Sequence, residues 1–171
     1  MSFPFQPSRP TLCKKLNQVL KDMSDSDLIK LYSGRILELA ADIPLTERLV
    51  APQASVKKRS PLCGSTVTVD VVSDGEKITE FGQDVKACAL GQAAASVVAA
   101  HIIGRTRSEV ETARDQLKDM LKNNGPAPQA PFDALEVLMP ARDFKNRHAS
   151  ILLALDATVE AFAEAQEVAC A

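Results

Sequence analysis

The chain has 171 residues, of which 46% are hydrophobic, and a formal net charge of −2. This length and hydrophobic content suffice for one domain with a sizeable core, which excludes a chain that is disordered throughout. The slightly acidic balance argues against a generic nucleic-acid-binding protein, because phosphate binding usually shows as a strong basic excess. We therefore expect no nucleic-acid partner.

The N-terminal residues 1–23 contain several prolines and predict a flexible extension. They lack a charged segment followed by an uninterrupted apolar one, so we expect no secretory signal and a reduced, cytoplasmic compartment. The longest apolar run, 87–104, includes Gln92, Ser96 and His101. It falls short of the ~20 apolar residues that span a bilayer, which predicts a buried helix and no membrane partner.

A first helix is expected from Ser24 or Ser26 to Ala41, with Gly34 inside it and Pro44 preventing its continuation. Spacings of three and four residues place its apolar side chains on one buried stripe. These are Leu28, Leu31, Tyr32, Ile36 and Leu39.

Three strands are predicted next. Ala54–Arg59 is typical of an edge strand, and its basic residues either discourage aggregation or form a strip that faces a partner. Ser65–Val72 and Lys77–Gln83 alternate apolar and polar residues, and the Asp74-Gly75 dipeptide between them is a strong hairpin signal. The simplest arrangement is an antiparallel sheet with one covered face.

The remaining segments favour helices. A helix of small and β-branched residues follows Cys88 and ends near Gly104, and Ser108 with Glu111 forms a capping-box pattern for the next helix. A short helical turn over 131–138 and a last helix over 146–165 complete the chain. The expected fold class is α+β, with a three-stranded antiparallel sheet packed against four to five helices.

Two thiols form the candidate site, because the hairpin returns the chain and brings Cys88 near Cys63. Thiolates are soft ligands for zinc, iron and iron–sulfur clusters. The helix N-terminus at Cys88 also favours a negative sulfur. The alternative is that both are packed core thiols. His148 is either a further ligand or a residue that flanks the last helix.

Other chemistry has little support in the sequence. His101 lies within an apolar run and favours a core position, and Cys13 and Cys170 lie near the termini and are interpreted as incidental. The chain has no glycine-rich phosphate loop, no nucleophile elbow, no Cys-x-x-Cys pair and no distinctive pair of carboxylates. We therefore expect that the protein is not an enzyme.

A set of motifs resembles the scaffold proteins of iron–sulfur cluster assembly, which are the IscU, SufU and NifU N-terminal-type domains. The matching segments are Pro61-Leu62-Cys63-Gly64, Lys86-Ala87-Cys88-Ala89, Gln92–Ser96, Leu31-Tyr32 and Arg147–Leu152. The resemblance covers roughly residues 24–165, leaving 166–171 as a tail. The long stretch between Cys88 and His148 is more similar to the SufU branch than to the IscU branch.

The resemblance implies a ligand set. In that family three cysteines and an aspartate surround the cluster or a zinc ion, and some members add a histidine. Cys63 and Cys88 match the first two cysteines and His148 matches the histidine, whereas Ala149 takes the third cysteine position and Ser65 the aspartate position. The implied cofactor-binding and metal-binding residues are thus Cys63, Cys88 and His148, for an iron–sulfur cluster, a zinc ion or an iron ion.

The resemblance also implies function and partners. We expect a scaffold or carrier that transfers its cluster by ligand exchange, with a cysteine desulfurase and recipient apoproteins as partners, as a monomer or homodimer. Because Ala149 and Ser65 leave the ligand set incomplete, two alternatives stay open. One is an adaptor of the assembly machinery that binds no metal, and the other is a zinc-assisted acceptor of sulfur from the desulfurase.

Overall fold

The computed structural model describes residues 32–170, apart from the side chain of Cys170. The expected extension over 1–23, Cys13 and the expected helix start at Ser24 or Ser26 lie outside the described residues. Within them α2 is Gly34–Ala41, so that Gly34 is the first residue of this helix and not an interior one. Ile36 is its fully buried residue.

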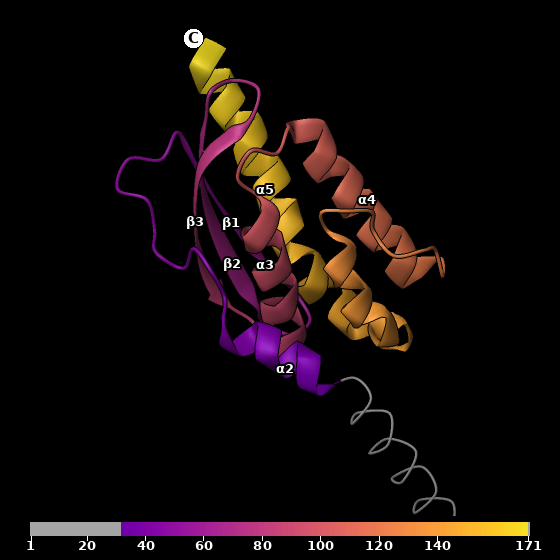
Figure 1. Cartoon of the computed structure of the whole chain (residues 1–171). Helices are drawn as coiled ribbons and strands as arrows, with labels where there is room; N and C mark the ends of the chain where they lie inside the picture. Colours follow the sequence, from indigo (N-terminus) through magenta and orange to yellow (C-terminus); the bar gives the residue numbers. More distant parts are fainter. Residues whose placement is uncertain (1–31, 171) are drawn as a thin grey trace, which may run out of the picture. The chain divides into compact units, whose positions relative to one another are not determined.

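A three-stranded antiparallel sheet in the order β1-β2-β3 forms one layer of the fold (Figure 1). β1 is Ala54–Arg59, β2 is Thr66–Ser73 and β3 is Ile78–Lys86. The helices that follow are α3 (Ala89–His101), α4 (Arg107–Lys122), the 3-10 helix η1 (Asp133–Asp143) and α5 (Lys145–Cys170). This arrangement confirms the predicted α+β class.

The β2–β3 hairpin forms as predicted, with Gly75 in the turn at a φ of 99°. The carboxylate of Asp74 accepts hydrogen bonds from the backbone N–H groups of Glu76 and Lys77, which is why Asp suits the first turn position. β3 continues to Lys86, beyond the predicted end at Gln83, because Val85 and Lys86 pair with Val67 and Thr66. The hairpin therefore delivers the chain directly to Cys88.

The core lies between one sheet face and the helices α3 and α5. Val67, Val69 and Val71 of β2 are fully buried, and most residues of α3 are buried as well. α5 runs along the sheet, and near its C-terminal end Gln166 Nε2 donates a hydrogen bond to Gly75 O in the hairpin turn at 2.9 Å (Figure 1). Residues 166–170, expected as a tail, thus continue this helix.

The opposite sheet face is partly covered by the segment between α2 and β1. Asp70 alternates with the buried valines of β2, so its side chain lies on this opposite face, and it is fully buried. Its carboxylate accepts hydrogen bonds from Arg48 Nε at 2.5 Å and from Arg48 Nη2 at 2.8 Å. A Cβ at Gly82 would lie 2.4 Å from Glu47 O, so this segment passes directly over β3. This segment therefore covers the part of the face around Asp70 and Gly82, whereas Lys57 and Arg59 of β1 remain exposed. The sequence predicted one covered face, and the structure adds this partial cover on the other.

The start of α4 differs from the sequence-based expectation. Its capping box consists of Thr106 and Glu109, and not of Ser108 and Glu111. Thr106 Oγ1 accepts from the N–H of Glu109, while the Glu109 carboxylate accepts from the N–H of Thr106 at 2.7 Å. Thr106 with Glu109 and Ser108 with Glu111 both have the spacing of a capping box. The β-bridge between Lys77 and Thr106 favours the helix start at Thr106. None of the helices described over residues 32–170 is long and apolar enough to cross a membrane.

Candidate cysteine and serine site

Cys63 lies in a tight loop that joins β1 to β2. The N–H of Ser60 donates to Ser65 O at 2.8 Å, and the N–H of Gly64 donates to Ser60 O at 3.1 Å. Gly64 has a φ of +70°, a left-handed conformation that a side chain at this position would strain. The loop thus holds the Cys63 side chain at one end of the sheet.

Hydroxyl groups surround the sulfur of Cys63. Its Sγ lies 3.3 Å from Ser60 Oγ and 3.1 Å from Ser65 Oγ. Partial burial raises the pKa of this thiol, but hydrogen bonds from the Ser60 and Ser65 side chains, the Ser65 backbone and Ser150 outweigh it and lower the pKa to about 6. The surrounding hydroxyl groups therefore favour the thiolate form of Cys63.

Cys88 is the N-cap residue of α3, immediately after β3. Its N–H donates to Ser65 Oγ at 3.4 Å, and its Sγ lies 3.4 Å from Ser150 Oγ. Ser150 in turn donates to Ser65 Oγ at 3.0 Å. The hairpin therefore brings Cys63 and Cys88 to one pair of hydrogen-bonded serines, as the sequence predicted for the two thiols, and both cysteines are free.

The position on α5 that faces the cysteines is Ser150. Ala149, which the sequence comparison placed at the third cysteine position, instead lines the grooves between α4 and α5 together with Arg114 and Asp156. The structure therefore places Ser150, and not Ala149, against the two thiols, because a step of one residue on a helix rotates the side chain by about 100°. The side chain that faces Cys88 from α5 is a buried serine hydroxyl.

Gly91 sets the spacing between α3 and α5 at this point. A Cβ at Gly91 would lie 2.7 Å from Ser150 Oγ and 3.0 Å from Ser150 O. Only a residue without a side chain lets the two helices approach so closely. The short contact explains how a side chain as small as serine reaches Cys88.

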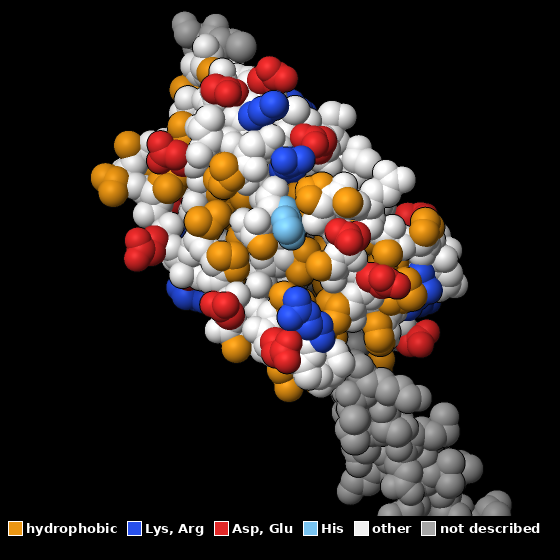
Figure 2. All heavy atoms as spheres, in the orientation of Figure 1, with side chains coloured by type: hydrophobic (Ala, Val, Ile, Leu, Met, Phe, Trp, Pro, Cys, Tyr) orange, Lys and Arg blue, Asp and Glu red, His pale blue; other side chains and the backbone are white. Residues whose placement is uncertain are grey.

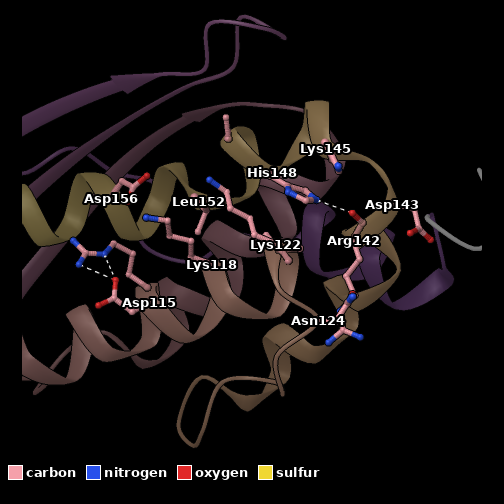
Figure 3. Close-up of a pocket in the computed structure, with 13 residues that line it drawn as sticks. Asp115, Lys118, Lys122, Asn124, Arg142, Asp143, Lys145, His148, Leu152 and Asp156 are labelled. Atoms are coloured by element: carbon pink, nitrogen blue, oxygen red, sulfur yellow. Dashed lines mark hydrogen bonds and ion pairs between the residues drawn. The ribbon is translucent and has the colours of Figure 1, made fainter.

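His148 is buried near the start of α5, and its hydrogen bonds lead away from the cysteines. Its Nε2 lies 2.9 Å from Ala141 O and 3.1 Å from Arg142 O, at the C-terminal end of η1 (Figure 3). The structure thus joins Cys63 and Cys88 through the serines and uses one ring nitrogen of His148 to hold η1. Among residues 32–169, no three His, Cys, Asp or Glu side chains form a group able to hold a metal ion.

The site therefore presents two thiols and three hydroxyl groups, those of Ser60, Ser65 and Ser150, at the junction of three segments. The resemblance implied only that Ser65 takes the position of an aspartate ligand, and the sequence predicted no role for Ser60 or Ser150. The sequence does contain a pattern that places Ser150 on the buried side of α5. Ser150 is the first of a series of small residues spaced four and three positions apart, and all of them are buried. The other members are Ala154, Ala157 and Ala161.

Comparison with solved structures defines the class of protein. The chain is similar to the crystal structure of a nitrogen-fixing NifU-like protein (N-terminal) from Brucella abortus, with 44% identity over 82% of this chain and 98% of that chain and a TM-score of 0.79. It also shares its fold with a putative iron–sulfur cluster assembly scaffold protein for the SUF system from Fervidobacterium islandicum AW-1. That match has 20% identity over 77% of this chain and 96% of the other, and a TM-score of 0.67.

A third structure, of a hypothetical protein, shares 21% identity over 78% of this chain and 97% of that chain, with a TM-score of 0.66. No protein-family model and no curated protein matches the sequence significantly. All three structures share the fold of this chain, and the first of them, at 44% identity over 82% of the chain, is similar enough to define its family. The chain belongs to the NifU-like N-terminal family, which confirms the resemblance found in its motifs.

Proposed function

We propose that the protein holds an iron–sulfur cluster, or the iron from which one is built, between Cys63 and Cys88 and passes it to recipient apoproteins. The observation that carries the proposal is the convergence of both thiols on the Ser65–Ser150 pair. A lowered thiol pKa favours the thiolate form, which is the form that binds a soft metal. A cysteine desulfurase would supply the sulfur as a persulfide, and two electrons from a thiol or other reductant would convert it to sulfide.

The ligand set favours carriage over storage. Two thiolates and two neutral hydroxyl groups bind iron more weakly than three thiolates and a carboxylate, because an alcohol remains protonated near neutral pH. An acceptor that offers more thiolates would therefore withdraw the cargo by ligand exchange. We propose that the serines at positions 65 and 150 bias the site toward release.

Anaerobic reconstitution tests the proposal. The wild type, incubated with ferrous iron and sulfide and then desalted, should retain both and show the visible absorption of a thiolate-bound cluster. A Cys63→Ser/Cys88→Ser double variant should retain neither. Equal iron and sulfide in the two proteins would show that the cysteines do not hold the cargo.

The low pKa of Cys63 supports a second candidate function, acceptance of sulfur from the desulfurase. The Cys63 thiolate would attack the outer sulfur of a persulfide on the donor cysteine. A new S–S bond then forms at Cys63 while the S–S bond of the donor breaks, and the donor cysteine leaves as a thiolate. Mass spectrometry for an added ~32 Da on the peptide that contains Cys63 detects this product.

A further inference from the structure

Two adjoining grooves lie between α4 and α5, beside the two cysteines, neither of which lines them. The larger has a volume of about 1010 Å³ and extends from Arg114 to Lys145, and the smaller has a volume of about 440 Å³ and reaches Ser60. Arg114, Ala149 and Asp156 line both. The two form one continuous surface, which we call the α4–α5 groove.

The groove is basic although the chain is slightly acidic. Eight lysine and arginine side chains line it against four aspartate and glutamate side chains, an excess of 8 − 4 = 4 positive charges, whereas the whole chain carries −2. The basic residues are Lys58, Arg59, Arg107, Arg114, Lys118, Lys122, Arg142 and Lys145. On the face drawn in Figure 2, acidic and basic side chains of the described residues are instead interspersed with hydrophobic ones.

Some of these cations already have partners. Lys58 pairs with Glu160, Arg107 with Glu111 at 2.8 Å and Arg114 with Asp115 at 2.9 Å. Within the described chain Lys118 and Lys122 make no ion pair. Both extend from α4 toward α5, where Leu152 and Asp156 lie (Figure 3). The groove therefore has uncommitted positive charge at its centre.

Asp156 gives independent evidence that these cations converge. Burial raises the pKa of its carboxyl group, while Arg114, Lys58, Lys118 and Lys122 all act to lower it. Four cations from β1 and α4 thus act on one point of the groove. The floor beneath them is apolar, with Leu121, Leu152 and Leu153.

The basic residues of α4 form a row that suits an extended chain. Arg107, Arg114, Lys118 and Lys122 are seven, four and four residues apart, so they share one side of the helix. At 1.5 Å per residue the row is roughly 22 Å long. An extended peptide of about seven residues covers this length at ~3.3 Å per residue.

We propose that the α4–α5 groove binds an extended acidic segment of a partner protein, with carboxylates over the lysine row and apolar side chains on the leucine floor. The smaller groove ends at Ser60, whose Oγ lies 3.3 Å from the sulfur of Cys63. A segment bound here would hold its protein beside the cysteine site. The proposal depends on charge and shape alone and does not require that the cysteines bind a cluster.

Fluorescence anisotropy with a labelled peptide of about twelve residues, rich in Glu and Asp and containing two Leu, tests this inference in the full chain. Binding of the peptide is expected at low salt concentration. It should weaken as salt is added, because the electrostatic screening length is about 10 Å at 0.1 M salt and becomes shorter at higher concentrations. Lys118→Glu/Lys122→Glu should weaken it by at least about tenfold, because like charges then face each other. Lys118→Arg/Lys122→Arg should bind within about twofold of the wild type.

The matched control is Lys57→Glu/Lys77→Glu, which changes the net charge equally at exposed positions outside the groove. It should retain binding within about twofold, since screening limits distant charges. If the control and the groove variant lose the same peptide affinity, the peptide responds to the net charge of the protein and not to the groove, and the proposal is overturned. So would tighter binding of a single-stranded oligonucleotide or of pyrophosphate than of the peptide, or no peptide binding by the wild type.

Discussion

Ser150 donates its hydroxyl proton to Ser65 Oγ across 3.0 Å, and each serine also contacts one of the two cysteine sulfurs. A hydroxyl pair is neutral, satisfies itself by hydrogen bonding and needs no metal. The two serines therefore connect the thiols without adding negative charge to the site.

Restoring the missing ligands should strengthen metal binding. Ser65→Asp/Ser150→Cys adds a carboxylate and a thiol beside Cys63 and Cys88, which completes four ligands for a tetrahedral zinc ion. We expect zinc affinity to rise by at least about tenfold, measured by competition with a chromophoric chelator. Ser65→Asp/Ala149→Cys is the control, because Ala149 lines the α4–α5 groove and its replacement should add no ligand. Equal affinities in the two variants would contradict the placement of Ser150.

The reactivity of Cys63 should follow its lowered pKa. Alkylation by iodoacetamide, followed at Cys63 by peptide mass spectrometry, should reach half its maximal rate near pH 6. A midpoint at the ordinary value of about 8.5 would contradict the hydrogen-bond arrangement. Ser60→Ala should move the midpoint upward, because the Ser60 hydroxyl stabilises the thiolate.

The lowered pKa of Cys63 should also make the free energy of unfolding depend on pH. The folded-state pKa of Cys63 lies below that of an unfolded cysteine, so its contribution to the unfolding free energy is fully present above about pH 8.5. That contribution declines as the pH falls toward about 6. Urea unfolding across this range should show a smaller pH dependence for Cys63→Ser than for the wild type.

Gly91→Ala should destabilise the protein by about 1–3 kcal/mol, because the new methyl group meets Ser150 Oγ at 2.7 Å and the backbone of α5. Gly34→Ala is the matched control, since a Cβ there has no atom within 4 Å and alanine favours a helix. The control should have an unchanged or slightly higher melting temperature. Similar melting temperatures for both variants would show that α5 moves away without cost.

The buried carboxylate of Asp70 should contribute to stability through Arg48. Burial raises the pKa of Asp70, but bonds from the Arg48 and Ser55 side chains and the Leu49 N–H outweigh it, so the pKa lies below its usual value. Asp70→Ala should lower the unfolding free energy by about 1.5–3 kcal/mol at pH 7. Arg35→Ala, which removes the exposed pair with Glu38, should change it by less than about 0.5 kcal/mol.

The Asp70 effect should also depend on pH. The pKa of Asp70 is lower in the folded protein than in the unfolded chain, where it is near 3.8. The ionised carboxylate therefore stabilises the fold fully at pH values above 3.8, and this stabilisation disappears as the pH falls through the folded-state pKa. The difference between wild type and Asp70→Ala should therefore shrink below about pH 4. A difference that stays constant from neutral to acid pH would mean that the ion pair is not its source.

His148 stays a predicted ligand from the sequence, and the structure makes the prediction sharper. With Nε2 bonded to the carbonyl groups at the end of η1, only Nδ1 is left for a metal. If His148 is a ligand, His148→Ala should lose iron on reconstitution. Iron retained at the wild-type level, together with a lower melting temperature, would instead assign His148 to holding η1 on α5.

Local patterns predicted most of the fold because the deciding interactions are local. The Asp74-Gly75 turn fixes the hairpin, and the small residues after Cys88 fit only a buried helix. What failed depends on distant parts of the chain. The choice of Thr106 over Ser108 follows from a bridge to Lys77, and the orientation of Ser150 follows from the contact with Gly91. In α5 the series of small residues that begins at Ser150 marks the inward side, but nothing in this helix alone shows that this side meets the two thiols.

The cysteine site takes its parts from three separate segments, the loop at Cys63, the start of α3 at Cys88 and α5 at Ser150. During synthesis the two thiols exist as a pair only after β2 and β3 have paired, and Ser150 joins them only when α5 has docked. A chain that stops before residue 150, or that fails to bring its last helix onto the sheet, therefore has the two thiols without the serine of α5 that joins them. The complete site consequently exists only in a chain that has finished folding.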